Sequence, residues 1–176
     1  MKQQNNWYAF SGVASSGKTT LIALLEKKGY KVVHEAATEF VKLQFQKGLA
    51  IDDIRKDERH FQRVILQMKL FYEGLLNPND IVFIDRGIPD SVAFFKMYNL
   101  PMDKIMKEEI AEATYKKVFL FNRLPLIRED FRPEPEEEIA TMDHYNREAY
   151  KELGHTITEV PVMPIDDRLN FILNNL

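Results

Sequence analysis

Short apolar runs alternate with stretches of helical periodicity along most of the chain. The apolar runs predict strands over residues 7–11, 31–33, 81–84, 117–122 and 155–160. The stretches between them, with apolar residues every three or four positions, predict helices over 18–28, 36–47, 52–76, 136–152 and 165–175, and one or two helices over 89–114 that break near Pro101. This alternation predicts an α/β fold, in which a parallel sheet is covered by helices on both faces.

One segment departs from the alternation. Residues 123–138 (RLPLIREDFRPEPEEE) contain three prolines, three arginines and six acidic residues. This composition predicts a mobile lid that leaves and rejoins one domain, rather than a linker between two domains. Residues 1–176 are therefore expected to form a single domain, which agrees with the usual length of domains.

The charge and composition argue against several classes of partner. With 24 basic and 27 acidic residues the net charge is −3, which favours neither nucleic acid nor a polybasic membrane anchor. No apolar run is long enough to span a bilayer, and the opening MKQQNNW lacks the apolar stretch of a secretory signal. The absence of cysteine fits a reducing compartment, so a cytoplasmic protein is expected. The oligomeric state stays open.

The strongest motif lies directly after the first predicted strand. Residues 12–19 read GVASSGKT, the G-x-x-x-x-G-K-T pattern of a Walker A motif, or P-loop. Four residues between the glycines let backbone N–H groups surround a β-phosphate, while the next helix presents its positive N-terminus. Lys18 then reaches the β- and γ-phosphates, and the Thr19 hydroxyl reaches Mg²⁺. The predicted nucleotide-binding residues are Gly12, Val13, Ala14, Ser15, Ser16, Gly17, Lys18, Thr19 and Thr20.

Two acidic residues follow predicted strands, where ligands of open parallel sheets bind. Asp85 follows IVFI and is expected to hold Mg²⁺ together with Thr19; the alternative is a residue that only ends the strand. Glu35 follows KVV and could accept a proton from a phosphoryl acceptor, help to hold the metal, or only favour a helix N-terminus. Arg86 could stabilise the transferred phosphoryl group or pair with a nearby acid.

The predicted lid and one predicted helix carry further candidates. Arg128 and Arg132 are the preferred pair to clamp the transferred group when the lid closes; the alternative is a solvated loop whose arginines pair with neighbouring acids. Gln62 and Gln67 could contact a substrate ring, although a stripe of aromatic residues at helical spacing is more often part of a core.

The sequence lacks the motifs that are typical of other classes of P-loop protein. After the fourth predicted strand the residues are Asn122-Arg123-Leu124-Pro125, not the N-K-x-D with which GTPases recognise guanine. No string similar to LSGGQ indicates a transporter ATPase, and the chain is short for a two-part ring-forming AAA+ module.

The segments FSGVASSGKTTL, VVHEAATEF, VFIDRGIPDSVAFF, FNRLPLIREDFRPEPEEE and TITEVP together resemble a known family. It is the AAA-type P-loop domain family shared by the NadR ribosylnicotinamide kinase domain and the TRPL-translocation-defect proteins. The resemblance covers nearly the whole chain and implies a kinase-like three-layer fold with strand order 2-3-1-4-5. It also implies phosphate and Mg²⁺ roles for Gly12 to Thr19, acid roles for Glu35 and Asp85, and a role for the lid arginines. Thr38 stands where the family pattern has an arginine.

These features favour ATP-dependent phosphoryl transfer to a hydroxyl of a small nucleoside-like acceptor. The predicted catalytic residues are Lys18, Glu35, Asp85, Arg86, Arg128 and Arg132, with Mg²⁺ and ATP or GTP as the bound species. Either Glu35 or Asp85 is expected to take the proton of the acceptor hydroxyl. The alternatives are a nucleotide-dependent regulatory switch and a plain NTPase with water as acceptor.

Overall fold

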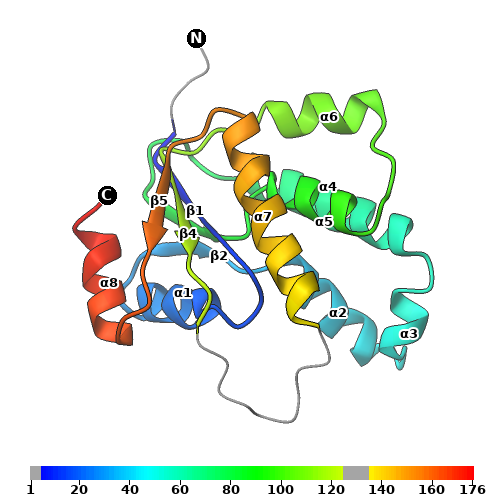
Figure 1. Cartoon of the computed structure of the whole chain (residues 1–176), viewed down its shortest axis with the longest axis horizontal. Coiled ribbons are helices and arrows are strands. Elements are labelled where there is room, and N and C mark those ends of the chain that lie inside the picture. The colour runs from blue at the N-terminus through cyan, green and yellow to red at the C-terminus, as the bar shows by residue number, and fades with distance from the viewer. Residues whose placement is uncertain (1–4, 125–134) are drawn as a thin grey trace.

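A sheet of five parallel strands forms the centre of the computed structural model, which describes residues 5–124 and 135–176 (Figure 1). The strands are β1 (Trp7–Ser11), β2 (Lys31–Val33), β3 (Val82–Asp85), β4 (Lys117–Phe121) and β5 (Ile157–Val160). They lie in the order β2-β3-β1-β4-β5, with every neighbouring pair parallel. The predicted α/β class and the strand order implied by the family resemblance are both confirmed.

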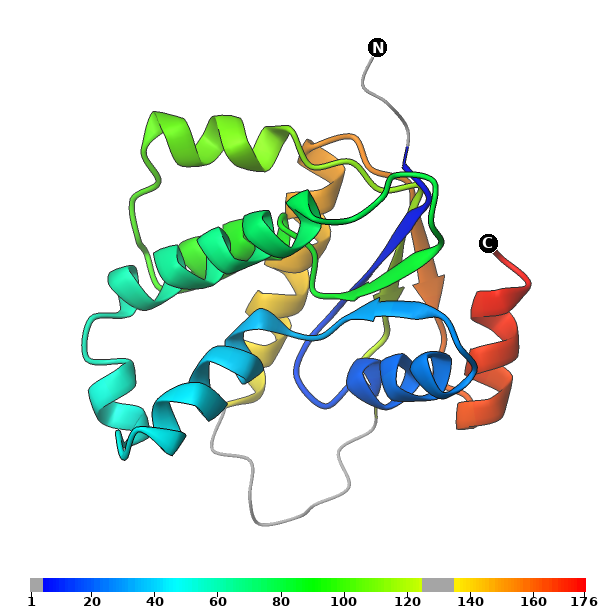
Figure 2. The same cartoon turned by 180° about the vertical axis from the view of Figure 1, so that it is seen from behind.

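Helices cover both faces of this sheet (Figures 1 and 2). In the described residues they are α1 (Lys18–Lys27), α2 (Ala36–Gln46), α3 (Ile51–Ile54), α4 (Glu58–Gly74), α5 (Asp90–Met97), α6 (Lys104–Ala111), α7 (Glu136–Glu152) and α8 (Ile165–Leu173). Helices α1 and α8 pack on one face, and α7 packs on the other beside α5. None of the described helices is long and apolar enough to cross a membrane.

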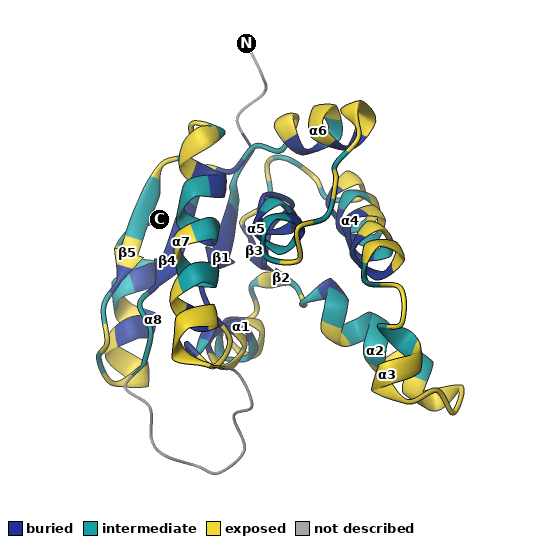
Figure 3. Cartoon of the chain, turned by 45° about the vertical axis from the view of Figure 1, so that its right-hand side comes forward, coloured by how far each residue is buried: buried dark blue, intermediate teal, exposed yellow. Residues whose placement is uncertain are grey.

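Large aromatic side chains fill the face of the sheet beneath α1 and α8. Phe10 lies at the centre, with Phe83, Phe119 and Phe121 around it at ring-centroid distances of 5.0–5.7 Å. The opposite face is built from smaller residues, including Ala9, on which α7 packs. Figure 3 shows the central strands as buried, which explains why they are nearly continuous apolar runs in the sequence.

One predicted helix was wrong. Residues 52–76 do not form one helix, because α3 ends at Ile54 and α4 begins at Glu58. Asp57 marks the break, since its side chain accepts a hydrogen bond from the His60 backbone N–H at 2.9 Å and so caps a new helix. The predicted break near Pro101 is confirmed by the separation of α5 from α6.

The strand order determines where a site can form. β1 is central, and the chain crosses from it towards β2 and β3 on one side and β4 and β5 on the other. Where the direction of the crossovers changes, as it does beside β1, the loops that follow neighbouring strands run in opposite directions. They leave a crevice beyond the carboxyl ends of those strands. The P-loop follows β1 and Glu35 follows β2 at this edge, and Asp85 is the last residue of β3. Most of the predicted lid, with Arg128 and Arg132, lies outside the described residues.

Candidate active site beyond the carboxyl ends of β1, β2 and β3

The loop between β1 and α1 depends on its two glycines. Gly12 and Gly17 have φ values of +128° and +91°, which residues with a Cβ rarely adopt. A Cβ on Gly12 would also lie 2.8 Å from the Phe121 carbonyl oxygen at the end of β4. Gly17 is the N-cap of α1, so the loop leads directly into the positive end of a helix.

Lys18 extends back over this loop. Its Nζ donates to the carbonyl oxygens of Gly12 and Val13 at 2.9 and 2.7 Å and to Ser16 Oγ at 3.0 Å. Burial and the nearby Arg86 lower the pKa of Lys18 to about 7, although Asp85, Asp90 and Glu35 act in the opposite direction. An anion in the loop would favour the charged form of this amine.

Thr19 and Asp85 form the candidate metal site. The Thr19 hydroxyl donates to Asp85 Oδ2 at 2.7 Å, and Asp85 Oδ1 is buried without a hydrogen-bond partner among the described residues. Burial raises the pKa of Asp85, and the hydrogen bond from Thr19 opposes that rise. A hydroxyl and a carboxylate with one free oxygen fit the oxygen ligands that Mg²⁺ takes beside nucleotide phosphates.

Glu35 and Arg86 form an ion pair across the ends of β2 and β3. Arg86 Nε donates to Glu35 Oε1 at 2.7 Å, and the Thr38 hydroxyl donates to Glu35 Oε2 at 2.7 Å. Burial would raise the pKa of Glu35, but Arg86, Thr38 and Lys18 together hold that pKa below its ordinary value. Glu35 is therefore a carboxylate at neutral pH. The hydroxyl of Thr38 orients it.

Arg86 is held from its other side by α5. Its Nη1 lies 3.3 Å from Asp90 Oδ1, and Asp90 also accepts hydrogen bonds from the hydroxyls of Ser11 and Tyr150. The backbone of Arg86 has φ +65°, a strained conformation for a residue other than glycine. Fixed carboxylates on two sides hold the guanidinium in place despite this strain.

A second buried network supports the turn after Arg86. The Tyr115 hydroxyl donates to Glu73 at 2.9 Å and accepts the backbone N–H of Ile88 at 2.8 Å. Lys69 donates to the Gly87 carbonyl oxygen at 3.0 Å. Burial raises the pKa of Glu73 to about 7. The backbone from Gly87 to Ile88 is therefore bonded both to α4 and to the loop that precedes β4.

Replacing Gly87 by alanine should destabilise the protein and displace Arg86. A Cβ there would lie 2.7 Å from the Tyr115 hydroxyl and 2.9 Å from that of Tyr150, and both hydroxyls are fixed by hydrogen bonds. Overpacking of this kind costs about 1–3 kcal/mol of unfolding free energy, which urea or thermal unfolding measures. Gly74→Ala is the matched control, because nothing lies within 4 Å of its Cβ. Equal stability of the two variants would contradict the packing argument.

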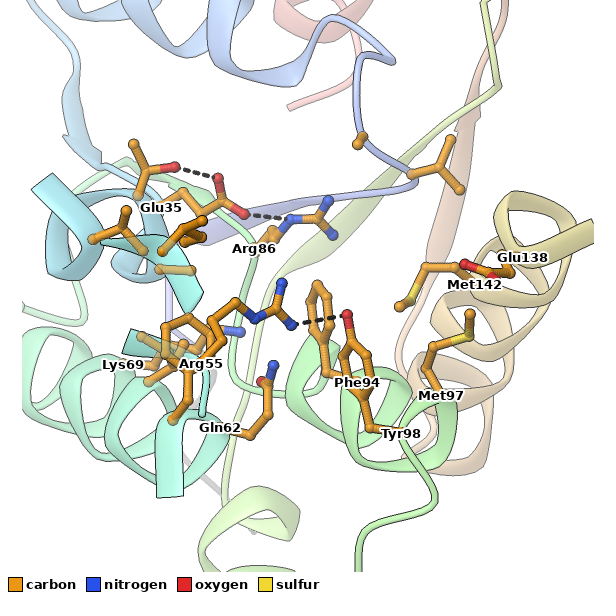
Figure 4. A pocket seen from close by; sticks show the side chains of 18 of the residues that line it. Glu35, Arg55, Gln62, Lys69, Arg86, Phe94, Met97, Tyr98, Glu138 and Met142 are labelled. Atoms are coloured by element: carbon orange, nitrogen blue, oxygen red, sulfur yellow. Dashed lines mark hydrogen bonds and ion pairs between the residues drawn. The ribbon is translucent and has the colours of Figure 1, made fainter. Parts of the chain in front are cut away.

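A cavity of about 490 Å³ opens beside Glu35 and Arg86 (Figure 4). Its walls come from the P-loop, α2, α3, α4, α5 and α7. Glu35 and Arg86 lie at one end, while Gln62 and Tyr98 lie at the other. The volume is within the range of small-molecule sites, and most of the lining is apolar or aromatic, as is usual for such sites.

The two candidate glutamines have different positions. Gln62 is buried at the cavity wall, with its amide donating to Glu58 at 2.8 Å. Gln67 lies outside this cavity, is exposed, and contacts Glu109 of α6.

Sequence reasoning missed several residues of the cavity and its support. Arg55 donates to Glu58 and to the Tyr98 hydroxyl, and its guanidinium lies over the rings of Phe61 and Tyr98. No local pattern distinguishes Arg55 from a surface arginine. No local pattern marked Asp90, because it is the first residue of α5 while Arg86 lies before that helix with a φ of +65°.

The comparisons with known proteins point to one family and one fold. A family model described as AAA domain matches residues 7–168. No curated protein matches the chain by sequence. Among solved structures, NadR in complex with NR is similar at 18% identity and a TM-score of 0.71, over 97% of this chain and 49% of that chain. The present chain thus spans about half the length of that NadR chain.

Two further similar structures match over nearly their whole length. Deoxyadenosine kinase from M. mycoides with bound dATP has 18% identity and a TM-score of 0.63, over 96% of this chain and 98% of that one. Thymidylate kinase from Ehrlichia chaffeensis has 16% identity and a TM-score of 0.63, over 98% of each chain. At such identities the likeness shows a shared P-loop kinase fold. With its family match over residues 7–168, the chain belongs to the AAA domain family.

Proposed function

We propose that the protein transfers the γ-phosphoryl group of ATP or GTP to a hydroxyl of a small nucleoside-like acceptor. The observation that carries this proposal is the cavity of about 490 Å³ beside Glu35 and Arg86, which extends from Val13 and Ala14 of the P-loop towards α4 and α5. A nucleotide switch or a plain NTPase has no need of a largely apolar pocket of this size next to a fixed carboxylate. The solved kinases of the same fold support the choice of reaction.

The roles of the residues follow from their positions. Lys18 and the loop N–H groups would hold the phosphates, and Thr19 and Asp85 would hold Mg²⁺, which neutralises charge on phosphate oxygens. Glu35 would accept the proton of the acceptor hydroxyl, whose oxygen bonds to the γ-phosphorus as the bond to the diphosphate breaks. Arg86 would orient Glu35, and Arg128 and Arg132 keep their sequence-based role as proposed clamps on the transferred group.

The charges lining the cavity favour an acceptor without a phosphate. Among the described lining residues, Arg55 is paired with Glu58, Arg86 with Glu35 and Asp90, and Lys42 with Glu39. Lys69 is buried against the Gly87 carbonyl. A monophosphate would have to compete with these carboxylates for Arg55, Arg86 and Lys42, and with the Gly87 carbonyl for Lys69. A neutral ring-bearing compound would instead contact Phe94 and Tyr98.

An acceptor screen tests this proposal. Purified protein with Mg·ATP or Mg·GTP is incubated with nucleosides, ribosylnicotinamide, nucleoside monophosphates and small polyols, while diphosphate release and product mass are followed. One nucleoside-like compound should raise diphosphate release well above the rate with water and should gain a phosphoryl group. If no compound does so, while di- and triphosphate complexes differ in conformation or partner binding, the protein is a switch instead.

A pair of variants then tests the cavity itself. Gln62→Leu should raise the KM for the acceptor by roughly 10-fold or more, because it removes a hydrogen-bonding group from the cavity wall. Gln67→Leu, on the exposed side of the same helix, should leave the KM unchanged. Equal effects of the two substitutions would exclude this cavity as the acceptor site.

A further inference from the structure

Arg168 of α8 is a buried charged side chain that lies against the P-loop. Helix α8 packs beside α1 on the same face of the sheet (Figures 1 and 2). The side chain is 2% exposed, and its Nη1 donates to the Ser16 carbonyl oxygen at 2.8 Å. The same nitrogen lies 2.9 Å from the position that a Cβ on Gly17 would take. The guanidinium therefore contacts the loop where α1 begins.

Within residues 5–124 and 135–176 the rest of this guanidinium lacks partners. Its Nε and Nη2 are both buried with no hydrogen-bond acceptor in that part of the chain, and no carboxylate there forms an ion pair with it. Arg86 is almost as deeply buried but is paired with both Glu35 and Asp90. A buried charge without partners is costly, so two orphaned donors on one guanidinium indicate a missing acceptor.

A purely structural role does not account for these donors. One N–H is enough to hold the Ser16 carbonyl, and a shorter or less polar side chain would avoid the burial of the other donors. The chemistry that fits is an anion with several acceptor oxygens, because guanidinium binds phosphate through more than one N–H. The neighbouring Gly17 precedes Lys18 and Thr19, so the P-loop brings such an anion to this point.

We propose that Arg168 binds the phosphate chain of the nucleotide, with Nε and Nη2 donating to phosphate oxygens. Arg168 and Lys18 then supply two fixed cationic groups to one anion, from α8 and α1. This inference rests on the nucleotide site of the proposed function. It does not depend on the identity of the acceptor.

Substitution of Arg168 tests this proposal. Calorimetry measures the binding of Mg·ATP, Mg·ADP and adenosine to the unaltered chain and to Arg168→Met, and thermal unfolding gives the midpoint of each protein without ligand. Arg168→Met should lower the affinity for both nucleotides by roughly 10- to 100-fold, as expected for the loss of a charge-assisted hydrogen bond. The affinity for adenosine, which has no phosphate, should not change. The midpoint should stay the same or rise, because a buried unpaired charge is removed. Arg168→Lys, which keeps the charge, should show a smaller loss. Arg63→Met, an exposed arginine on α4, is the control.

Three results would overturn the proposal. Unchanged nucleotide affinity with a lowered midpoint would mean that Arg168 only supports the loop. An equal loss for adenosine would place the contact at the base or ribose rather than at phosphate. If the unaltered protein bound no nucleoside triphosphate, the proposed function would itself be wrong. If the unaltered protein binds nucleotide but phosphorylates no acceptor, the kinase proposal is wrong. The Arg168 proposal can still be tested in that case, because it concerns nucleotide binding alone.

Discussion

Replacing Lys18 by methionine is expected to weaken binding of Mg·ATP by about 100-fold or more, roughly 3 kcal/mol. The amine is the charged group whose Nζ lies over the P-loop, bonded to Gly12, Val13 and Ser16. Methionine keeps much of the volume of the side chain but removes the positive charge and all of its donors. Phosphoryl transfer should fall at least as far, because the same charge faces the oxygens on which negative charge develops.

Thermal unfolding with and without nucleotide measures this effect. Ligand at 100 times its Kd stabilises a folded protein by about 2.7 kcal/mol, which for a chain of this length raises the midpoint by roughly 5–10 °C. Lys18→Met should lose nearly all of that rise. Lys27→Met, an exposed lysine at the end of the same helix, should keep it. A Lys18→Met protein that is stabilised as strongly as the unaltered chain would show that the loop is not the nucleotide site.

Replacing Glu35 by glutamine should reduce transfer to the acceptor by about 10²- to 10⁴-fold while nucleotide affinity survives. Glutamine preserves the shape of the side chain and an oxygen for Arg86, but it cannot accept a proton from a hydroxyl. Single-turnover transfer and the Kd for Mg·ATP are the two measurements. Glu39→Gln, one turn further along α2 with a partly exposed side chain, is the matched control and should have no effect on either.

The Asp85→Asn variant distinguishes the role of Asp85 from that of Glu35. Asp85 accepts a hydrogen bond from the Thr19 hydroxyl, and its other oxygen is buried without a partner among the described residues. Loss of this carboxylate should therefore reduce the Mg²⁺ dependence of nucleotide binding, and it should also lower the rates of hydrolysis and of phosphoryl transfer. Equal losses of nucleotide affinity in the Glu35 and Asp85 variants would make both of them metal-site residues and would remove Glu35 as the base.

The pH dependence of transfer provides an independent check on Glu35. Arg86, Thr38 and Lys18 hold the pKa of this carboxyl below its ordinary value, so it is ionised throughout the neutral range. Activity that depends on the carboxylate should therefore persist on acidification until the pH falls below the ordinary glutamate pKa of about 4.3, provided that the protein remains folded. An acid limb centred near neutrality would point to a different base.

The sequence by itself determined the fold class and the P-loop of the candidate site. The apolar runs that became β1, β3 and β4 are buried on both faces, so their pattern hardly depends on distant contacts. The P-loop is equally local, because its glycines, lysine and threonine act within eight consecutive residues. The positions of Glu35 and Asp85 followed as well, since residues after parallel strands gather at one edge of the sheet.

Only the tertiary structure decided the cavity beside Glu35 and Arg86 and the contacts that hold the buried arginines. The cavity is formed where separate helices meet, so no local pattern shows that Arg55 and Tyr98 face each other. The break at Asp57 depended on whether a side-chain cap outweighed continued helical periodicity, which composition does not settle. Arg168 contacts Ser16 across 152 positions of the chain, and only the packing of the described residues shows that its Nε and Nη2 have no acceptor among them. Local periodicity encodes elements and short loops, whereas charges that meet through space are encoded only by the packing of the whole chain.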